Sequence, residues 1–335
     1  MNGFDRSTRV IQLDSLERKL LNLTQTEFPL SSEPYADLGQ RLGIDADEVI
    51  RRIKQLKRKE IIRLIGPVLD SRSLGYQTTL VPMKVTGTYL EKAEQNIAGY
   101  SGVSHGYERD HYFNIWFTLA VPQAVGIETE LERLAHSAGA EAAFSLPAVK
   151  VFKIGAYFDM DEEGQSTSVP HGSSILAKQV VLSATERLII NELQQDLPLI
   201  SAPFTAMAQR VDMDAEQFLA QCRSLQQRGV IRRFSASINH NHVGFVANAM
   251  ACWVAPADTI DIAGCKLASL KEVSHCYERK TNPLWRYNLF AVIHGCSREV
   301  CQEIADKVSR ETGLKDYALL YSTKEFKKTR VKYLV

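Results

Sequence analysis

The sequence has no run of apolar residues that approaches the roughly 18 to 20 needed to cross a bilayer, and charged residues interrupt its first ten positions, where a secretory signal requires an apolar core. Its six cysteines are confined to the second half and include no Cys-x-x-Cys pair. This distribution is typical of a reduced protein without disulfides. We therefore expect a soluble, cytoplasmic protein.

Several site motifs are also missing. No cluster of histidines and cysteines has the spacing of a zinc site, and the chain contains neither a glycine-rich phosphate loop nor a nucleophile elbow. Metal-centred, nucleotide and acyl-transfer chemistry therefore have no support. A formal net charge of +1 argues against whole-molecule attraction to nucleic acid, although the basic stretch 51–63 could attract it locally.

What the sequence does contain is a long internal repeat. The segment Val103–Arg109, VSHGYER, recurs at Val273–Arg279 as VSHCYER, an offset of 170 residues (275 − 105). Towards the N-terminus, Phe28-Pro29-Leu30 matches Leu197-Pro198-Leu199 at an offset of 169 (197 − 28). The unit is far longer than the about 20 to 50 residues of a solenoid repeat. With 335 residues, the chain has room for two modules of similar fold.

Each module begins with a helix-turn-helix pattern. Capping boxes at 14–17 and 183–186 place a short oxygen-bearing side chain three residues before a glutamate and predict the start of a first helix. A short helix, a tight turn and a second helix are predicted over 35–59 and again over 204–228. A β-branched run follows each time and predicts a wing or hinge strand. We assign residues 12–72 and 181–240 to these two domains.

The rest of each module, residues 73–160 and 241–335, alternates strand-like and helix-like patterns in the order β-α-β-β-α-β. This order is typical of a ferredoxin-like sandwich, so the predicted fold class is α+β, as a tandem repeat. Asp161–Gly172 is polar and poor in large apolar residues, and we take residues 161–180 as the linker between the modules.

A helix-turn-helix joined to a β-α-β-β-α-β module resembles the Lrp/AsnC regulators, and Leu225–Arg232, LQQRGVIR, is similar to a Leu-x-x-x-Gly-Val-Ile-Arg pattern of that family. The tandem His-x-Tyr-x-Arg motifs, followed by the aromatic segments Tyr112–Thr118 and Trp285–Phe290, resemble the siroheme decarboxylases in their fused two-subunit form. The resemblance covers residues 12–330. Its specificity lies in the motif pair, because the fold alone is compatible with either function.

The resemblance implies an enzyme that removes two acetate carboxylates from siroheme and gives 12,18-didecarboxysiroheme, on the route to haem d1 or to haem. It also implies no cofactor of the protein's own, because the substrate carries the iron. The two halves would form an internal pseudo-dimer, and further association into a homo-oligomer stays open.

Siroheme is a flat, iron-bearing macrocycle with eight carboxylates, so its pocket needs an apolar slot and several cations. Loss of CO2 also requires an acid near the carbon left behind. Alternate residues of a strand share one face. The histidines of the two motifs are candidate acids or axial iron ligands, the tyrosines proton donors or orienting groups, and the arginines carboxylate clamps. These candidates are His105, Tyr107, Arg109, His275, Tyr277 and Arg279.

A second set comprises candidate substrate-binding residues: His111, Trp116, Trp285, Arg286, His294, Lys150 and Lys324. Each has a structural alternative, because strand histidines often only hold the fold and aromatic residues often fill the core. Basic residues at the ends of the last strands, among them Lys328 and Arg330, usually form a solvated face, and contact with carboxylates is the alternative. Since several candidates occur in one half only, we expect one asymmetric pocket.

A DNA-binding transcriptional regulator is the alternative function. The second helix-turn-helix copy has a presumed recognition helix, Ala215–Arg223, with one arginine, which suits phosphates poorly. The first copy is better suited, with Arg51, Arg52, Lys54, Lys57 and Arg58. We favour the enzyme and do not expect DNA binding.

Overall fold

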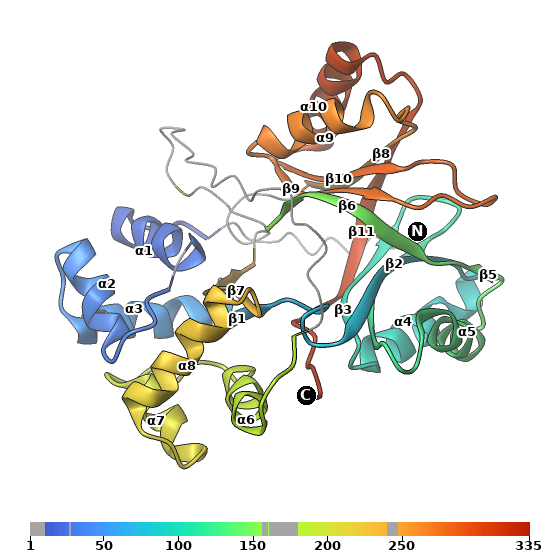
Figure 1. Cartoon of the computed structure of the whole chain (residues 1–335). Coiled ribbons are helices and arrows are strands. Elements are labelled where there is room, and N and C mark those ends of the chain that lie inside the picture. Colours follow the sequence, from blue (N-terminus) through green and yellow to red (C-terminus); the bar gives the residue numbers. More distant parts are fainter. Residues whose placement is uncertain (1–10, 27, 156–159, 161–179, 240–246) are drawn as a thin grey trace.

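Two modules with the same order of elements follow each other along the chain (Figure 1). A computed structural model describes residues 11–26, 28–155, 160, 180–239 and 247–335. The predicted linker, residues 161–180, lies outside this description except for Val180. The tandem α+β organisation predicted from the sequence is confirmed.

Three helices open each module, in the regions where the sequence predicts them. Both predicted capping boxes form: the Glu17 backbone N–H donates to Asp14 Oδ1 at 2.6 Å, and Ser183 pairs with Glu186 in the same way. These contacts satisfy donors that a helix start leaves unpaired. The helices are α1 (Ser15–Thr26), α2 (Pro34–Leu42) and α3 (Ala46–Arg58) in the first module, and α6 (Ala184–Leu193), α7 (Pro203–Arg210) and α8 (Ala215–Gln227) in the second.

The predicted hinge strands are β1 (Ile62–Leu69) and β7 (Ile231–Ile238), and they pair with each other in antiparallel register. This two-stranded ribbon lies between the two sets of helices in Figure 1. Side chains from both modules share one apolar core, which includes Leu20, Ile53 and Phe234. The two helix-turn-helix units therefore form one body.

The remaining elements confirm the β-α-β-β-α-β order, with a short 3-10 turn and a two-residue strand added in the first half. The first half contains β2 (Tyr76–Lys84), η1 (Gly87–Tyr89), α4 (Leu90–Gly99), β3 (Val103–Arg109), β4 (Ile115–Pro122), α5 (Ile127–Ala138), β5 (Ala142–Ala143) and β6 (Leu146–Ile154). The second half contains β8 (Ala247–Trp253), α9 (Ile260–Ser269), β9 (Val273–Arg279), β10 (Leu289–Gly295), α10 (Arg298–Thr312) and β11 (Tyr317–Lys328).

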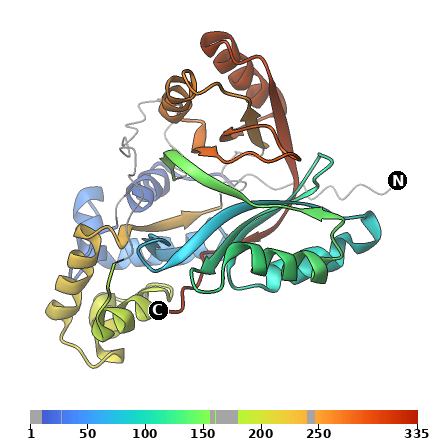
Figure 2. The same cartoon turned by 45° about the vertical axis from the view of Figure 1, so that its right-hand side comes forward.

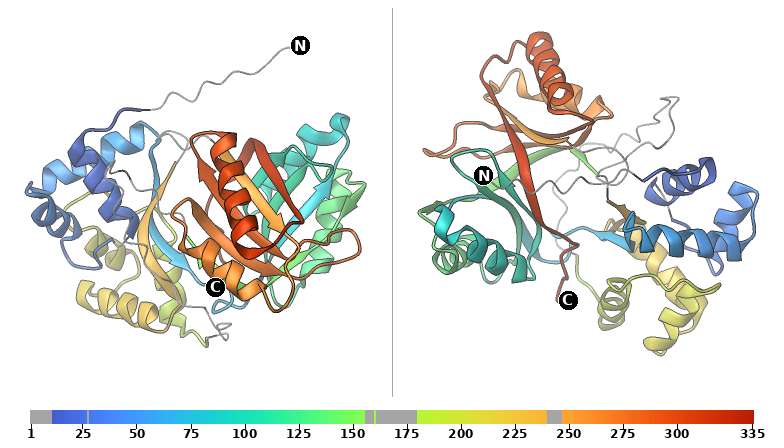
Figure 3. Two further views of the ribbon diagram at one scale, coloured as in Figure 1. Left: turned by 90° about the horizontal axis from the view of Figure 1, so that it is seen from above. Right: turned by 180° about the vertical axis from the view of Figure 1, so that it is seen from behind.

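The last strand of each half extends into the sheet of the other half. β11 pairs with β8 through Tyr317–Tyr321 and then with β3 from Ser322 onwards. β6 pairs briefly with β2 and then with β9 from Ala148 onwards. Because β2 also pairs with β4, eight strands of the larger sheet close into a ring: β2, β3, β4, β6, β8, β9, β10 and β11. Figure 3 shows β11, in red, running from the α10 side to the first-half sheet.

Helices cover the outer face of this ring. α4 and α5 pack on the first-half sheet, and α9 and α10 pack on the second, each over its own apolar cluster (Figures 1 and 2). A separate cluster, which includes Trp116, Leu146, Phe290 and Leu320, joins inner-face residues of both sheets. The inner space of the ring is therefore partly filled by apolar side chains from both halves.

Candidate functional site

A cavity of about 760 Å³ lies between the inner faces of the two sheets and the β1–β7 ribbon. Its volume falls within the roughly 300 to 1,000 Å³ of small-molecule and cofactor sites. All six predicted catalytic residues line it: His105, Tyr107 and Arg109 from β3, and His275, Tyr277 and Arg279 from β9. The two motif copies, far apart in sequence, therefore face one shared space.

Strand alternation explains why three residues of each motif point inwards. The residues between them face the other way: Gly106 lies against Phe326, and Cys276 belongs to the cluster beneath α9 and α10. The predicted orientation of the motif side chains is thus the observed one.

The two motif arginines are fixed in matching ways. Arg109 Nη1 donates to the Leu320 carbonyl and Arg279 Nη1 donates to the Leu146 carbonyl, each at 2.7 Å. Each guanidinium also lies over the tyrosine of its own motif. Burial lowers the pKa of both arginines to about 10, so both remain cations at neutral pH. The Nε atoms of both have no hydrogen-bond partner in the structure.

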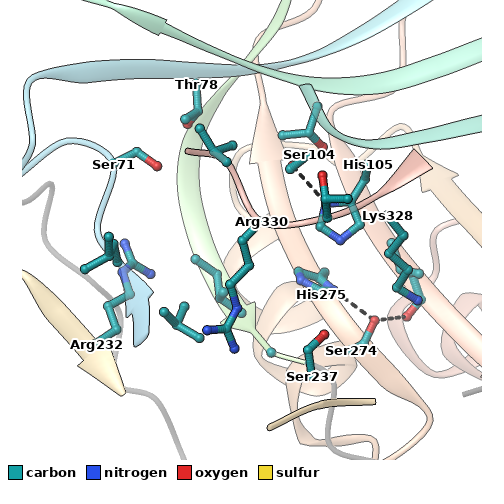
Figure 4. Close-up of a pocket in the computed structure, with 18 of the residues that line it drawn as sticks. Ser71, Thr78, Ser104, His105, Arg232, Ser237, Ser274, His275, Lys328 and Arg330 are labelled. Atoms are coloured by element: carbon teal, nitrogen blue, oxygen red, sulfur yellow. Dashed lines mark hydrogen bonds between the residues drawn. The ribbon is translucent and has the colours of Figure 1, made fainter. Parts of the chain in front are cut away.

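Each motif histidine is oriented by the serine before it. His105 Nδ1 lies 2.9 Å from Ser104 Oγ, and His275 Nδ1 lies 2.9 Å from Ser274 Oγ, as Figure 4 shows. Burial, followed by the charge of Lys328, lowers the pKa of His105 to about 3. Burial, followed by His105, lowers the pKa of His275 to about 3. Both imidazoles are neutral at pH 7 and keep Nε2 for a ligand.

His294 adds a contact that only the second motif has. Its Nε2 lies 2.8 Å from Ser274 Oγ, and burial lowers its pKa to about 3. Its position in β10 corresponds to Ala120 of β4 (294 − 174), which has no polar side chain. The second motif histidine is therefore held by a longer chain of polar groups, His275–Ser274–His294.

The two tyrosines differ in their neighbours. Burial, followed by the charge of Glu325, raises the pKa of Tyr107. Burial also raises the pKa of Tyr277, and the charge of Arg279 opposes this shift, as the charge of Arg109 opposes that of Tyr107. Both phenols are therefore protonated at neutral pH and able to donate hydrogen bonds.

Further cations line the cavity in addition to the motif arginines. Arg330 donates to the carbonyls of Pro67 and Ser235, Arg63 pairs with Glu325 at 2.8 Å, and Arg232 pairs with Asp70. Burial lowers the pKa of Lys328 to about 8. The lining also includes cations outside both candidate sets: Arg63, Arg72, Arg232, Arg233, Lys328, Arg330 and Lys332. Its acidic residues are Asp70 and Asp196.

A signal for two of these cations was present in the repeat. Arg63 and Arg232 occupy matching positions (232 − 63 = 169) at the end of each β-branched run, but a hinge strand gave no reason to place them near the motifs. For Lys328 and Arg330, the sequence indicates only a place at the basic end of a strand. They reach the cavity because β11 continues past its own sheet, which no local pattern reveals.

Only some of the candidate substrate-binding residues predicted from the sequence lie at the cavity. Trp116 and His294 line the cavity, and the other five residues do not. Arg286, Lys150 and Lys324 form ion pairs with Asp316, Asp261 and Glu94, respectively. His111 accepts from the Phe113 N–H at 3.1 Å, and Trp285 packs behind Trp116 with ring centroids 5.0 Å apart. We leave these five out of the proposed site.

The cations of α3, the better candidate for contact with DNA, are largely paired. Arg51 and Arg52 both bind Glu48, Arg52 also reaches Asp14 at 2.7 Å, and Lys57 pairs with Asp196 of the other module. Intramolecular pairing reduces the charge that this helix can offer to phosphates.

Two kinds of structural feature are absent from the described ranges. No helix there is both long and apolar enough to cross a membrane. Nor do three or more His, Cys, Asp or Glu side chains come together there in an arrangement that could hold a metal ion.

Family models match both parts of each module. A model of the siroheme decarboxylase NirDL-like HTH domain matches residues 17–63 and 186–232, and a model of the AsnC-like ligand binding domain matches residues 73–153 and 242–327. A siroheme decarboxylase of Hydrogenobacter thermophilus is 40% identical over 316 residues, which cover 94% of each chain. The chain belongs to the siroheme decarboxylase family.

Two other siroheme decarboxylases clarify the architecture. A crystal structure of the siroheme decarboxylase NirDL in complex with an iron-uroporphyrin III analogue aligns with a TM-score of 0.72 and 36% identity, covering 96% of this chain and 95% of that one. The alpha subunit of the Desulfovibrio desulfuricans siroheme decarboxylase is 41% identical over 151 residues, or 45% of this chain and 87% of that one. In this family, then, one module of the present chain matches a separate subunit of a relative.

Proposed function

We propose that this chain removes two acetate carboxylates from siroheme as CO2 and releases 12,18-didecarboxysiroheme, a step towards haem d1 or haem. The observation that carries the proposal is that both His-x-Tyr-x-Arg motifs open into one cation-lined cavity. The family relatives named above are siroheme decarboxylases, and one of them binds an iron-uroporphyrin III analogue, which is also an iron tetrapyrrole rich in carboxylates.

The charges and surfaces of the cavity suit such a substrate. Arg109 and Arg279 lie on opposing strands and can each hold carboxylates through guanidinium N–H groups that the carbonyl contacts leave available. Trp116, Met250 and Phe290 supply apolar surface for the flat ring. Because the iron arrives with the substrate, the proposal needs no cofactor of the protein's own.

Two neutral imidazoles face this space, one from each half. Since serine contacts occupy the Nδ1 atoms of His105 and His275, their Nε2 atoms are left to orient the macrocycle. The halves would thus act on one substrate as an internal pseudo-dimer, whatever higher assembly the protein forms.

Anaerobic incubation with siroheme tests the proposal. We expect the tetrapyrrole to lose the mass of two molecules of CO2, detected by mass spectrometry of the extracted pigment. An unchanged tetrapyrrole, together with tight and salt-sensitive binding to an operator DNA, would support a regulator instead.

A further inference from the structure

Arg233, on strand β7 of the ribbon, is one of the cations that line the cavity. Across the described ranges its guanidinium forms neither an ion pair nor a hydrogen bond, and its buried Nε atom has no partner. Among the described arginines of the lining, Arg109 and Arg279 of the motifs share this buried, unpartnered Nε. Arg232 and Arg330, labelled in Figure 4, instead have partners in the protein. Arg233 therefore resembles the two motif arginines.

The guanidinium of Arg233 lies against the end of β6, the strand that crosses from the first half into the second. A Cβ at Gly155 would lie 2.9 Å from Arg233 Nη1 and 3.2 Å from Nη2. Gly155 directly follows Ile154, which lies opposite His275 in the register of β6 with β9. The lack of a side chain at Gly155 thus lets the guanidinium approach the strand end beside the second motif.

This arginine belongs to the second half alone. At the offset of 169 that relates the two ribbon strands, its counterpart in β1 is Leu64 (233 − 169). Leu64 also lines the cavity. The ribbon therefore presents a cation at one of two equivalent positions and an apolar side chain at the other.

We propose that Arg233 binds a carboxylate of the tetrapyrrole and so fixes which way round the substrate lies between the two motifs. This inference rests on the proposed function. A largely buried charge without a counter-ion is costly, and a guanidinium can bind a carboxylate through two parallel N–H groups. Because the two motifs are nearly equivalent, the macrocycle could lie between them in two orientations. A cation in one half only favours one of them.

The competing role for Arg233 is purely structural, with its side chain filling the space beside Gly155. A structural role predicts a change in stability without a change in the affinity for tetrapyrroles. Arg233→Leu removes the charge and gives both halves the residue of the first. Arg233→Lys keeps the charge but loses the planar fork. Arg187→Met, which replaces an exposed arginine of α6 outside the cavity lining, is the matched control.

The first measurement is the affinity of the full chain for iron uroporphyrin III, followed by absorbance. We expect Arg233→Leu to weaken binding by about 10- to 100-fold, as loss of a charged hydrogen-bond donor does, and Arg233→Lys to weaken it less. Arg187→Met should match the wild type.

Iron coproporphyrin III identifies the carboxylate, because it keeps the propionates and carries methyl groups in place of the acetates. A similar loss of affinity for both ligands would support a propionate as the partner of Arg233. A loss confined to iron uroporphyrin III would support an acetate.

The second measurement is the orientation of the substrate. Siroheme conversion is quenched early under anaerobic conditions, and the two singly decarboxylated isomers are separated by chromatography. We expect one isomer to predominate in the wild type and both to form in Arg233→Leu.

Unchanged affinity for iron uroporphyrin III in Arg233→Leu, or the same predominant isomer in this variant and the wild type, would overturn the inference and leave the proposed function intact. If Arg233→Leu fails to fold by circular dichroism, Arg233→Gln takes its place in both measurements. A wild-type protein that leaves siroheme unchanged would instead overturn the proposed function, and this inference with it.

Discussion

The Arg109 guanidinium donates a hydrogen bond to the carbonyl oxygen of Leu320 at 2.7 Å, so the last strand of the second half fixes a motif side chain of the first. Arg279 and Leu146 form the reciprocal contact. Neither motif is complete within its own module. The crossing strands therefore hold the ring together and also set the positions of the cations that face the cavity.

Replacing Arg109 by lysine should destabilise the fold and weaken substrate binding. Lysine lacks the planar fork that reaches the Leu320 carbonyl, and loss of a hydrogen bond to a charged group costs about 1.5 to 3 kcal/mol. Urea denaturation measures the free energy of unfolding. Arg286→Lys, whose pair with Asp316 is exposed to solvent and contributes little to stability, is the control. Equal losses in the two variants would contradict the structural role of Arg109.

Gly106→Ala should lower the free energy of unfolding by about 1 to 3 kcal/mol, the usual cost of overpacking a core. A Cβ at this position would come within 2.2 Å of the Phe326 ring. Calorimetry or urea denaturation would detect the change. Gly99→Ala is the control: a Cβ there meets no atom within 4 Å, so the free energy of unfolding should not fall. A Gly106→Ala protein as stable as the wild type would contradict the prediction and show that Phe326 relaxes freely.

The same contact explains the one residue in which the two seven-residue motifs differ. In the second half, the space for the equivalent ring, Phe152, is provided by Gly264, and the motif carries Cys276. In the first half the positions are reversed, with Glu94 (264 − 170) in place of the glycine and Gly106 in place of the cysteine. The small residue lies on the helix in the second half and on the strand in the first, and each crossing strand carries its phenylalanine.

The free energy of unfolding should fall as the pH is lowered from about 6.5 towards 4. The fall should be larger than protonation of carboxylates alone would cause. Burial, reinforced by nearby cations such as Lys328 and Arg233, holds the pKa values of His105, His275 and His294 at about 3. The unfolded chain binds protons at these histidines first, so acid favours unfolding by at most about 1.4 kcal/mol per pH unit for each.

The measurement is the free energy of unfolding at pH 7.5 and at pH 5.5 for the wild type and for a His105→Gln, His275→Gln variant. The variant should lose less stability between the two pH values. Identical losses would show that the histidines titrate normally in the folded protein.

DNA binding should be weak and non-specific. Glu48, Asp14 and Asp196 already pair with three of the five α3 cations, and α8 offers a poorer surface still. Fluorescence anisotropy with labelled duplexes, over a range of salt concentrations, tests this. Tight sequence-dependent binding at physiological salt would contradict it.

Local patterns in the sequence predicted most of the fold. Capping residues gave the starts of α1 and α6, and alternation gave the inward face of the motifs, because both depend on neighbours within a few residues. The crossing of β6 and β11 could not be predicted in this way. Pairing such as that of Lys328 with His105 joins residues more than two hundred positions apart, and the repeat alone suggests two equal sheets.

Only part of the site could be predicted, because local patterns do not show which distant segments the fold brings together. The motif residues share the cavity, but the extra cations come from segments that only the tertiary fold brings near. Lys150 and Lys324 lie on the crossing strands, yet alternation turns them towards Asp261 and Glu94 on the outer helices. Their charge and their place on a strand made both lysines candidates for substrate binding. Their contacts depend instead on the face of the strand from which each side chain projects.

The central claim is that both motifs work on one substrate in one cavity. Anaerobic siroheme conversion by His105→Ala and by His275→Ala tests it most directly, with the exposed His136→Ala as the control. We predict that each motif substitution alone slows formation of the doubly decarboxylated product at least about tenfold, or about 1.4 kcal/mol in the barrier, while the control does not. Wild-type turnover in either motif variant would contradict the claim.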